Sequence, residues 1–170
     1  FSNGGEILLQ SGSFTNNTTS GTGGAVVLTN SARLTMTGGE ISGNNGKNYG
    51  GAIFRKFNAN MPNTTGGTFN MYGGTIKNNT AKNGGAFFST TGGTINMTGG
   101  TISGNTATMN SNDAGGGAIY MRGNGKINIS GSAKINSNTA SRWGGAICLR
   151  QDSNQSTMLY MRGGEISGNR

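Results

Sequence analysis

Apolar residues recur along the chain in a fixed order, separated by glycines and polar residues. In each copy, a short alternating apolar pair leads to a polar turn and then to one apolar residue, which we call the anchor. The anchors are Phe14, Ile41, Ile76, Ile102, Ile135 and Ile166, and the third residue after each is an asparagine, namely Asn17, Asn44, Asn79, Asn105, Asn138 and Asn169. The anchors lie on average about 30 residues apart, a period typical of solenoid proteins.

Two further segments keep the same phase as the anchors. An alternating pair such as Ile95 and Met97 precedes each anchor, and the period of two predicts a strand. After each of the first five asparagines, across a loop of variable length, comes Gly-Gly-Ala with apolar residues, at 23–28, 50–55, 84–89, 116–121 and 144–149. The paired glycines supply backbone that can take a positive φ at a tight corner.

These segments predict an all-β fold. One repeat has too little apolar surface to fold alone, whereas stacked repeats bury a common interior and pair each strand with its copy in the next coil. We therefore predict a right-handed, single-stranded parallel β-helix with three short strands per coil and about five to six coils, forming one domain over residues 1–170 that is a segment of a longer array.

The same stacking assigns roles to the repeated residues. The anchors form a stack in the core, and the asparagines form a ladder at a corner, where each amide donates to one neighbour and accepts from the other. An asparagine side chain also bonds nearby backbone and tolerates the left-handed backbone conformation, which suits it to a corner.

The orientation of the Gly-Gly-Ala strands stays open. If Val26, Ile53, Phe87, Ile119 and Ile147 point inward, the alternate residues point outward, and these are the alanines together with Phe54, Phe88 and Tyr120. Those three aromatic residues would then form a flat, exposed apolar stripe that could bind or pack against a partner. In the reverse orientation the aromatic side chains lie in the core, and Arg55 and Ser89 face water.

Length differences between repeats fall in loops, which absorb insertions at little entropic cost. One set of loops follows the asparagines, as in residues 105–117, and another follows the Gly-Gly-Ala strands, at 56–67 and 150–158.

Charge and composition limit the possible chemistry. The 170 residues carry a formal charge of +8 and no histidine, which excludes a Ser/His or Cys/His nucleophile within the chain. The basic residues are spread out and lack the aromatic-interleaved motif of a nucleic-acid binder, so we expect a solvated positive surface and no specific nucleic-acid partner. Cys148 is the sole cysteine, a small apolar filler or, alternatively, a reactive thiol. No segment approaches the ~18 apolar residues of a transmembrane span.

Carboxylates are few. Glu40 and Glu165 occupy the same repeat position, and four coils would separate them by roughly 19 Å at the strand spacing, too far to share a proton or an ion. The remaining acidic residues are Glu6, Asp113 and Asp152. We therefore expect no enzymatic activity, no catalytic or metal-binding residues and no cofactor. The alternative is a carbohydrate-active β-helix that binds or cleaves polysaccharide, and cleavage needs two carboxylates within about 10 Å in an aromatic groove.

Together, Gly-Gly-Ala-Ile and Phe/Ile-x-x-Asn resemble the paired motifs of polymorphic outer-membrane proteins and related adhesin-like right-handed β-helices of bacteria. Gly-Gly-Ala occurs five times, and the strict Phe-x-x-Asn form occurs in "FTNN" at 14–17. The resemblance covers essentially the whole chain. It implies a secreted protein displayed on a bacterial surface, with an adhesive or structural role.

Partners follow from the open ends of such a stack, which would present unpaired backbone. We expect neighbouring repeats of a longer protein to cover them, or copies of the chain that stack end to end into a filament. A host-cell or glycan surface is the expected external partner.

Overall fold

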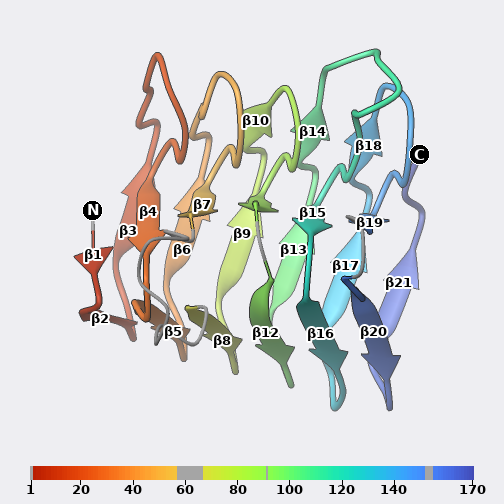
Figure 1. Ribbon diagram of the computed structural model, residues 1–170. Coiled ribbons are helices and arrows are strands. Elements are labelled where there is room, and N and C mark those ends of the chain that lie inside the picture. Colours follow the sequence, from red (N-terminus) through yellow and green to blue (C-terminus); the bar gives the residue numbers. More distant parts are fainter. Residues whose placement is uncertain (1, 57–66, 91, 152–154) are drawn as a thin grey trace.

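A computed structural model describes residues 2–56, 67–90, 92–151 and 155–170. In these ranges all regular structure is β, and every strand pairing is parallel. Strands of like position stack side by side along one axis, from β1 near the N-terminus to β21 near the C-terminus (Figure 1). The predicted parallel β-helix is therefore confirmed.

Three six-stranded sheets form the long faces of the described coils. The GGA sheet comprises β1 (Ser2–Asn3), β4 (Val26–Thr29), β7 (Ile53–Lys56), β11 (Phe87–Ser89), β15 (Ile119–Arg122) and β19 (Ile147–Arg150). The middle sheet comprises β2 (Glu6–Leu9), β5 (Arg33–Met36), β8 (Thr68–Met71), β12 (Gly93–Met97), β16 (Gly125–Ile129) and β20 (Met158–Met161). The anchor sheet comprises β3 (Ser13–Thr15), β6 (Glu40–Ser42), β9 (Thr75–Lys77), β13 (Thr101–Ser103), β17 (Lys134–Asn136) and β21 (Glu165–Ser167).

The path of the chain gives the hand of the coil. In Figure 1 the front strands β16 and β20 run downward, the paler β17 and β21 run upward behind them, and successive coils advance from left to right. A coil that descends in front while it advances to the right is right-handed, as predicted.

A fourth, short ladder differs from the prediction of three strands per coil. It contains β10 (Thr80–Ala81), β14 (Thr106–Ala107) and β18 (Thr139–Ala140), and isolated bridges continue it through Asn45 to Thr18. Each of its strands follows a ladder asparagine directly. The chain leaves that corner extended, so the backbone of the next two residues also pairs with neighbouring coils.

The interior consists of residues stacked on their own counterparts. Each anchor is paired with the anchor of the next coil, from Phe14 opposite Ile41 through to Ile135 opposite Ile166. The four central anchors have no exposed surface, while Phe14 and Ile166 in the end coils are partly buried. Inward residues of the middle sheet, such as Ile95 and Met97, complete the core.

The two glycines of each Gly-Gly-Ala have different tasks. The first takes a positive φ, for example 62° at Gly84. The second does not, although the sequence predicts positive φ for the pair. It is needed for space, because a Cβ at Gly85 would lie 2.2 Å from the carbonyl oxygen of Gly117 in the next coil. Glycine therefore allows the backbones of adjacent coils to approach at this corner.

Candidate functional site

The six asparagines after the anchors form a continuous column, which we call the inner ladder. At each step, the backbone N–H and the Nδ2 of one asparagine donate to the Oδ1 of the asparagine in the next coil, at 2.8–3.0 Å. Asn79, Asn105 and Asn138 are fully buried. The Nδ2 of Asn105 also donates to the carbonyls of Ile76 and Ser103. In the central coils the inner ladder thus satisfies the polar backbone at a corner that water does not reach.

The left-handed residue at this corner lies one position before the predicted one. None of the ladder asparagines is among the described residues with positive φ. Instead the residue that precedes each has it, namely Asn16, Gly43, Asn78, Gly104, Ser137 and Gly168, with φ between 54° and 64°. Because the preceding residue adopts the left-handed conformation, each ladder asparagine can direct its amide along the stack.

The aromatic residues Phe54, Phe88 and Tyr120, here called the aromatic column, point away from the main core. They form a separate cluster, with ring centroids 5.9 Å apart for Phe54 and Phe88 and 4.9 Å for Phe88 and Tyr120. The prediction that they form an exposed stripe is wrong, because their exposed fractions are only 2–6%. They are an outward-facing column that other parts of the chain cover.

The inward side of the same strands also differs from expectation. The alanines belong to the main core rather than to the aromatic column, as Ala52, Ala86 and Ala118 show. The reverse orientation, with Arg55 and Ser89 in water, is wrong as well, since both are buried. The Arg55 Nη1 donates to the Gly92 carbonyl at 2.6 Å, and burial lowers the pKa of Arg55 to about 10.

Tyr49 covers the aromatic column from outside. Its ring centroid lies 4.5 Å from that of Phe88, and the residue keeps 39% of its surface exposed. Beside it opens a cavity of about 260 Å³, which we call the column cavity. Its walls are Tyr49, Asn83, Phe88, Thr90, Met109, Asp113, Tyr120 and Arg122. A volume below that of drug-sized pockets fits a single small ring.

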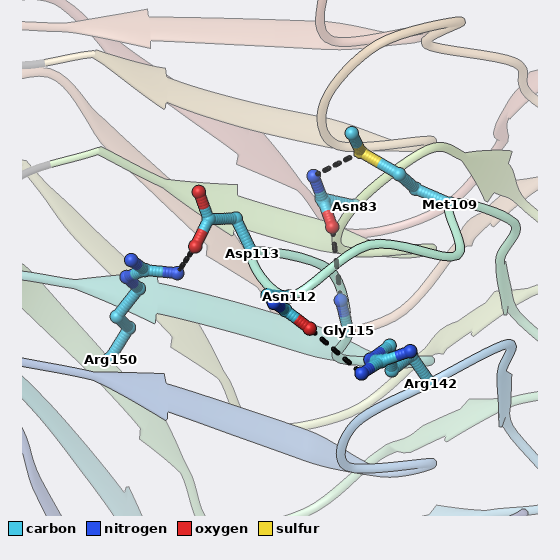
Figure 2. Close-up of polar contacts among 7 residues, drawn as sticks. All are labelled: Asn83, Met109, Asn112, Asp113, Gly115, Arg142 and Arg150. Atoms are coloured by element: carbon cyan, nitrogen blue, oxygen red, sulfur yellow. Dashed lines mark hydrogen bonds and ion pairs between the residues drawn. The ribbon is translucent and has the colours of Figure 1, made fainter.

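Two residues of the loop from Met109 to Gly115, Met109 and Asp113, line the column cavity. Figure 2 shows the polar contacts that hold this loop. Asn83 holds both ends of this loop, donating to the Met109 sulfur and accepting from the Gly115 N–H at 3.0 Å. In the middle of the loop, Asp113 pairs with Arg150 of the last coil. The loop is thus tied to coils on both sides of it.

Cationic residues lie along one edge of the outer face of the GGA sheet. On its strand, each stands two residues after the position that the aromatic column occupies. Arg122 and Arg150 are directly paired in the strand register, and Lys56 stands opposite Thr29 at the same end of the sheet. We call Lys56, Arg122 and Arg150 the basic row. Asp113 raises the pKa of Arg150, so this guanidinium stays charged.

Among the described residues, Asp113 is the single carboxylate that lines the column cavity, and no group of three or more His, Cys, Asp or Glu could hold a metal ion. Asp152 lies outside the described residues, as do the predicted loop residues 57–66 and 152–154. Glu40 bonds Lys77 and Ser42, of which the Lys77 bond most lowers its pKa. Burial raises the pKa of Cys148 beside Tyr120, which disfavours the thiolate.

Sequence reasoning missed a second column of asparagines, on the outer face of the middle sheet. Asn96 donates to Asn70, and Asn128 to Asn96, each at 2.8 Å. This outer ladder is half-buried. The signal was present, because each of the three asparagines stands between the two members of an alternating pair.

The corner and the GGA strand together form the unit that comparison with known families detects. The model of the Chlamydia polymorphic membrane protein repeat matches residues 11–29, 99–122 and 132–150. The chain contains repeats like those of polymorphic membrane proteins. Each matched segment runs from the anchor strand through the ladder asparagine to the end of the GGA strand, as β13 to β15 do in the second match. No curated protein and no solved structure matches the chain.

No helix long and apolar enough to cross a membrane occurs in the described part of the chain.

Proposed function

We propose that the chain is a non-enzymatic, adhesive β-helix segment of a protein displayed on a bacterial cell surface. The observation that carries the proposal is the coincidence of the three matched repeats with the structural unit of the coil. The matched family is named for a membrane protein of Chlamydia, which supports an extracellular location coarsely. A rigid stack with loops on its faces suits display, because loops can vary while the stack is kept.

Display of the chain on a non-adherent bacterium tests this proposal. We expect bacteria that carry the chain to attach to cultured host cells. Bacteria that carry Gly85→Ala should not attach, because the added Cβ meets the Gly117 carbonyl and disrupts the stack. A folded, displayed chain that confers no attachment would overturn the adhesive role.

The rival is a polysaccharide-cleaving β-helix, which the aromatic walls of the column cavity favour. We favour binding without cleavage, because cleavage needs two carboxylates close together. Asp113 forms an ion pair with Arg150, and no second described carboxylate lines the cavity. A reducing-end assay on neutral and acidic polysaccharides should show no new chain ends. Cleavage that Asp113→Asn abolishes would establish the rival.

We also propose that the last coil stacks on a further coil of the same kind, supplied by a second copy when the chain is isolated. Strand β20 lies at the edge of the middle sheet, and its Leu159 and Met161 are exposed where Ile127 and Ile129 of the preceding coil are buried. Sedimentation velocity of the wild type should show end-to-end oligomers. Leu159→Lys should convert them to monomers, whereas the control Tyr72→Lys, on an exposed corner, should leave them intact. A monodisperse wild-type monomer would contradict self-stacking.

A further inference from the structure

We propose that the column cavity and the basic row together bind an acidic glycan, meaning a polysaccharide whose sugars carry carboxylate or sulfate groups. This inference rests on the adhesive function proposed above and names its ligand class and its site. It uses one face of the molecule, the outer side of the GGA sheet between β7 and β19.

The cavity offers the two kinds of surface that a sugar ring requires. Tyr49, which packs on the buried Phe88 and is itself 39% exposed, presents aromatic surface against which the apolar face of a pyranose can lie. Thr90 adds a half-buried hydroxyl to the lining of the cavity, where a ring hydroxyl can exchange a hydrogen bond with it. The volume of about 260 Å³ limits the occupant to one small ring at a time.

The charge of the site selects an acidic sugar. Arg122 lines the cavity, and Arg150 stands beside it in the next coil. Among the described residues of this face, the basic row supplies three cations and Asp113, which is paired with Arg150, supplies one carboxylate. A guanidinium has five N–H donors in a planar fork that matches carboxylate and sulfate oxygens, and it keeps donors available when one is already engaged.

The geometry also favours a polysaccharide over a single sugar as the ligand. The aromatic column and the basic row both run along the helix axis, along which adjacent coils lie about 4.8 Å apart. The aromatic column has one residue in each of three successive coils, whereas in the basic row Thr90 stands in the coil between Lys56 and Arg122. A glycan that lies parallel to the axis can therefore place one ring in the cavity while acidic groups of neighbouring rings meet Arg150 and Lys56. An acidic peptide would use the cations but gain little from a cavity of this size and polarity.

Calorimetric titration of the purified chain tests the assignment. The probes are a heparin hexasaccharide, a hexagalacturonate, neutral maltohexaose and hexaglutamate. We expect at least one acidic hexasaccharide to bind, with an affinity that falls as NaCl is raised. Maltohexaose and hexaglutamate should bind at least 10-fold more weakly than that sugar. Equal binding of hexaglutamate, or binding of neither acidic sugar, would overturn the proposal.

Paired variants locate the site. Arg122→Gln should weaken binding about 10-fold, and Tyr49→Ala about 5-fold, as expected for loss of a charge-assisted bond and of a stacking surface. The controls are Arg33→Gln, on the middle sheet beside Glu6, and Tyr72→Ala, which is 54% exposed on another corner. Each control should change the affinity less than 2-fold. Equal losses in site and control variants would show a general charge effect and overturn the site.

Circular dichroism of each variant identifies those that fail to fold. If Arg122→Gln fails to fold, Tyr49→Ala still tests the site, because the Tyr49 side chain is partly exposed. Because purified protein is used, the result is separate from the adhesion test. Attachment that fails while the glycan binds counts against the proposed function alone. Attachment that persists unchanged in a glycan-blind variant counts against this inference alone.

Discussion

Two asparagine ladders run along the same stack of coils, and they differ in their surroundings. In the inner ladder, Asn79 and Asn105 are fully buried, and each Oδ1 accepts from both a side chain and a backbone N–H. In the outer ladder, Asn96 is half-buried and makes one side-chain bond to each neighbour. The side-chain bonds are 2.8–2.9 Å long in both ladders.

Equal bond lengths therefore do not imply equal contributions to stability. Loss of an inner asparagine leaves buried donors and acceptors without partners, and each such group costs about 1–3 kcal/mol. Loss of an outer asparagine lets water take its place. We therefore expect the exposure of a polar contact to water to set its contribution to stability, in the two ladders and in the exposed ion pair of Asp113.

The largest effect is expected for Asn105→Ala. This change removes the acceptor of the Asn79 backbone N–H and Nδ2, and it frees the carbonyls of Ile76 and Ser103. We expect the free energy of unfolding to fall by about 3 kcal/mol or more, measured by urea denaturation. Asn96→Ala should cost less than about 1 kcal/mol. Equal losses at both sites would contradict the comparison.

Asn105→Asp sharpens the comparison through pH. A buried carboxylate accepts from Asn79 but cannot donate to Asn138 or to the backbone carbonyls, so folding favours its protonated form. The folded state then binds more protons than the unfolded one, and stability falls as pH rises from 4 to 7, by about 1–3 kcal/mol. Asn96→Asp, whose group reaches water, should follow the wild type. Thermal unfolding at the two pH values measures this, and a flat Asn105→Asp profile would refute it.

Double-mutant cycles give a smaller, more specific quantity. The pair Asn79→Ala and Asn105→Ala should show a coupling energy of about 1 kcal/mol, since both residues share buried hydrogen bonds. The pair Asn70→Ala and Asn96→Ala should show coupling near zero. Urea unfolding of the single and double variants measures both, and stronger coupling in the outer pair would reverse our interpretation.

The smallest effect belongs to the most exposed polar contact. Asp113→Asn removes the ion pair with Arg150, in which the Asp113 side chain is 69% exposed. We expect a loss below about 1 kcal/mol that shrinks further in high salt. Thermal unfolding in low and high NaCl measures it. A loss as large as that of Asn105→Ala would show that the 109–115 loop is part of the folding core.

Recurrence in the sequence made the anchors and the inner ladder predictable, because in a stack each residue meets its own copy. The fourth ladder was predictable on the same ground, since Asn-Thr-Ala recurs at 79–81, 105–107 and 138–140. The outer ladder left a similar signal at Asn70, Asn96 and Asn128. The position of the left-handed residue was harder to infer, because Asn, Gly and Ser all occupy it.

The sequence by itself determined the stack of coils, its interior and its corner asparagines. These depend on contacts between equivalent positions, which repetition makes visible. Only the tertiary structure decided that the aromatic column is covered and that a cavity lies beside it. Those features depend on Tyr49, whose register partners in the adjacent coils are Thr22 and Asn83, and on the loop around Asp113, which is longer than the corresponding loops of the other repeats. A contact made once leaves no period in the sequence, so folding alone brings its residues together.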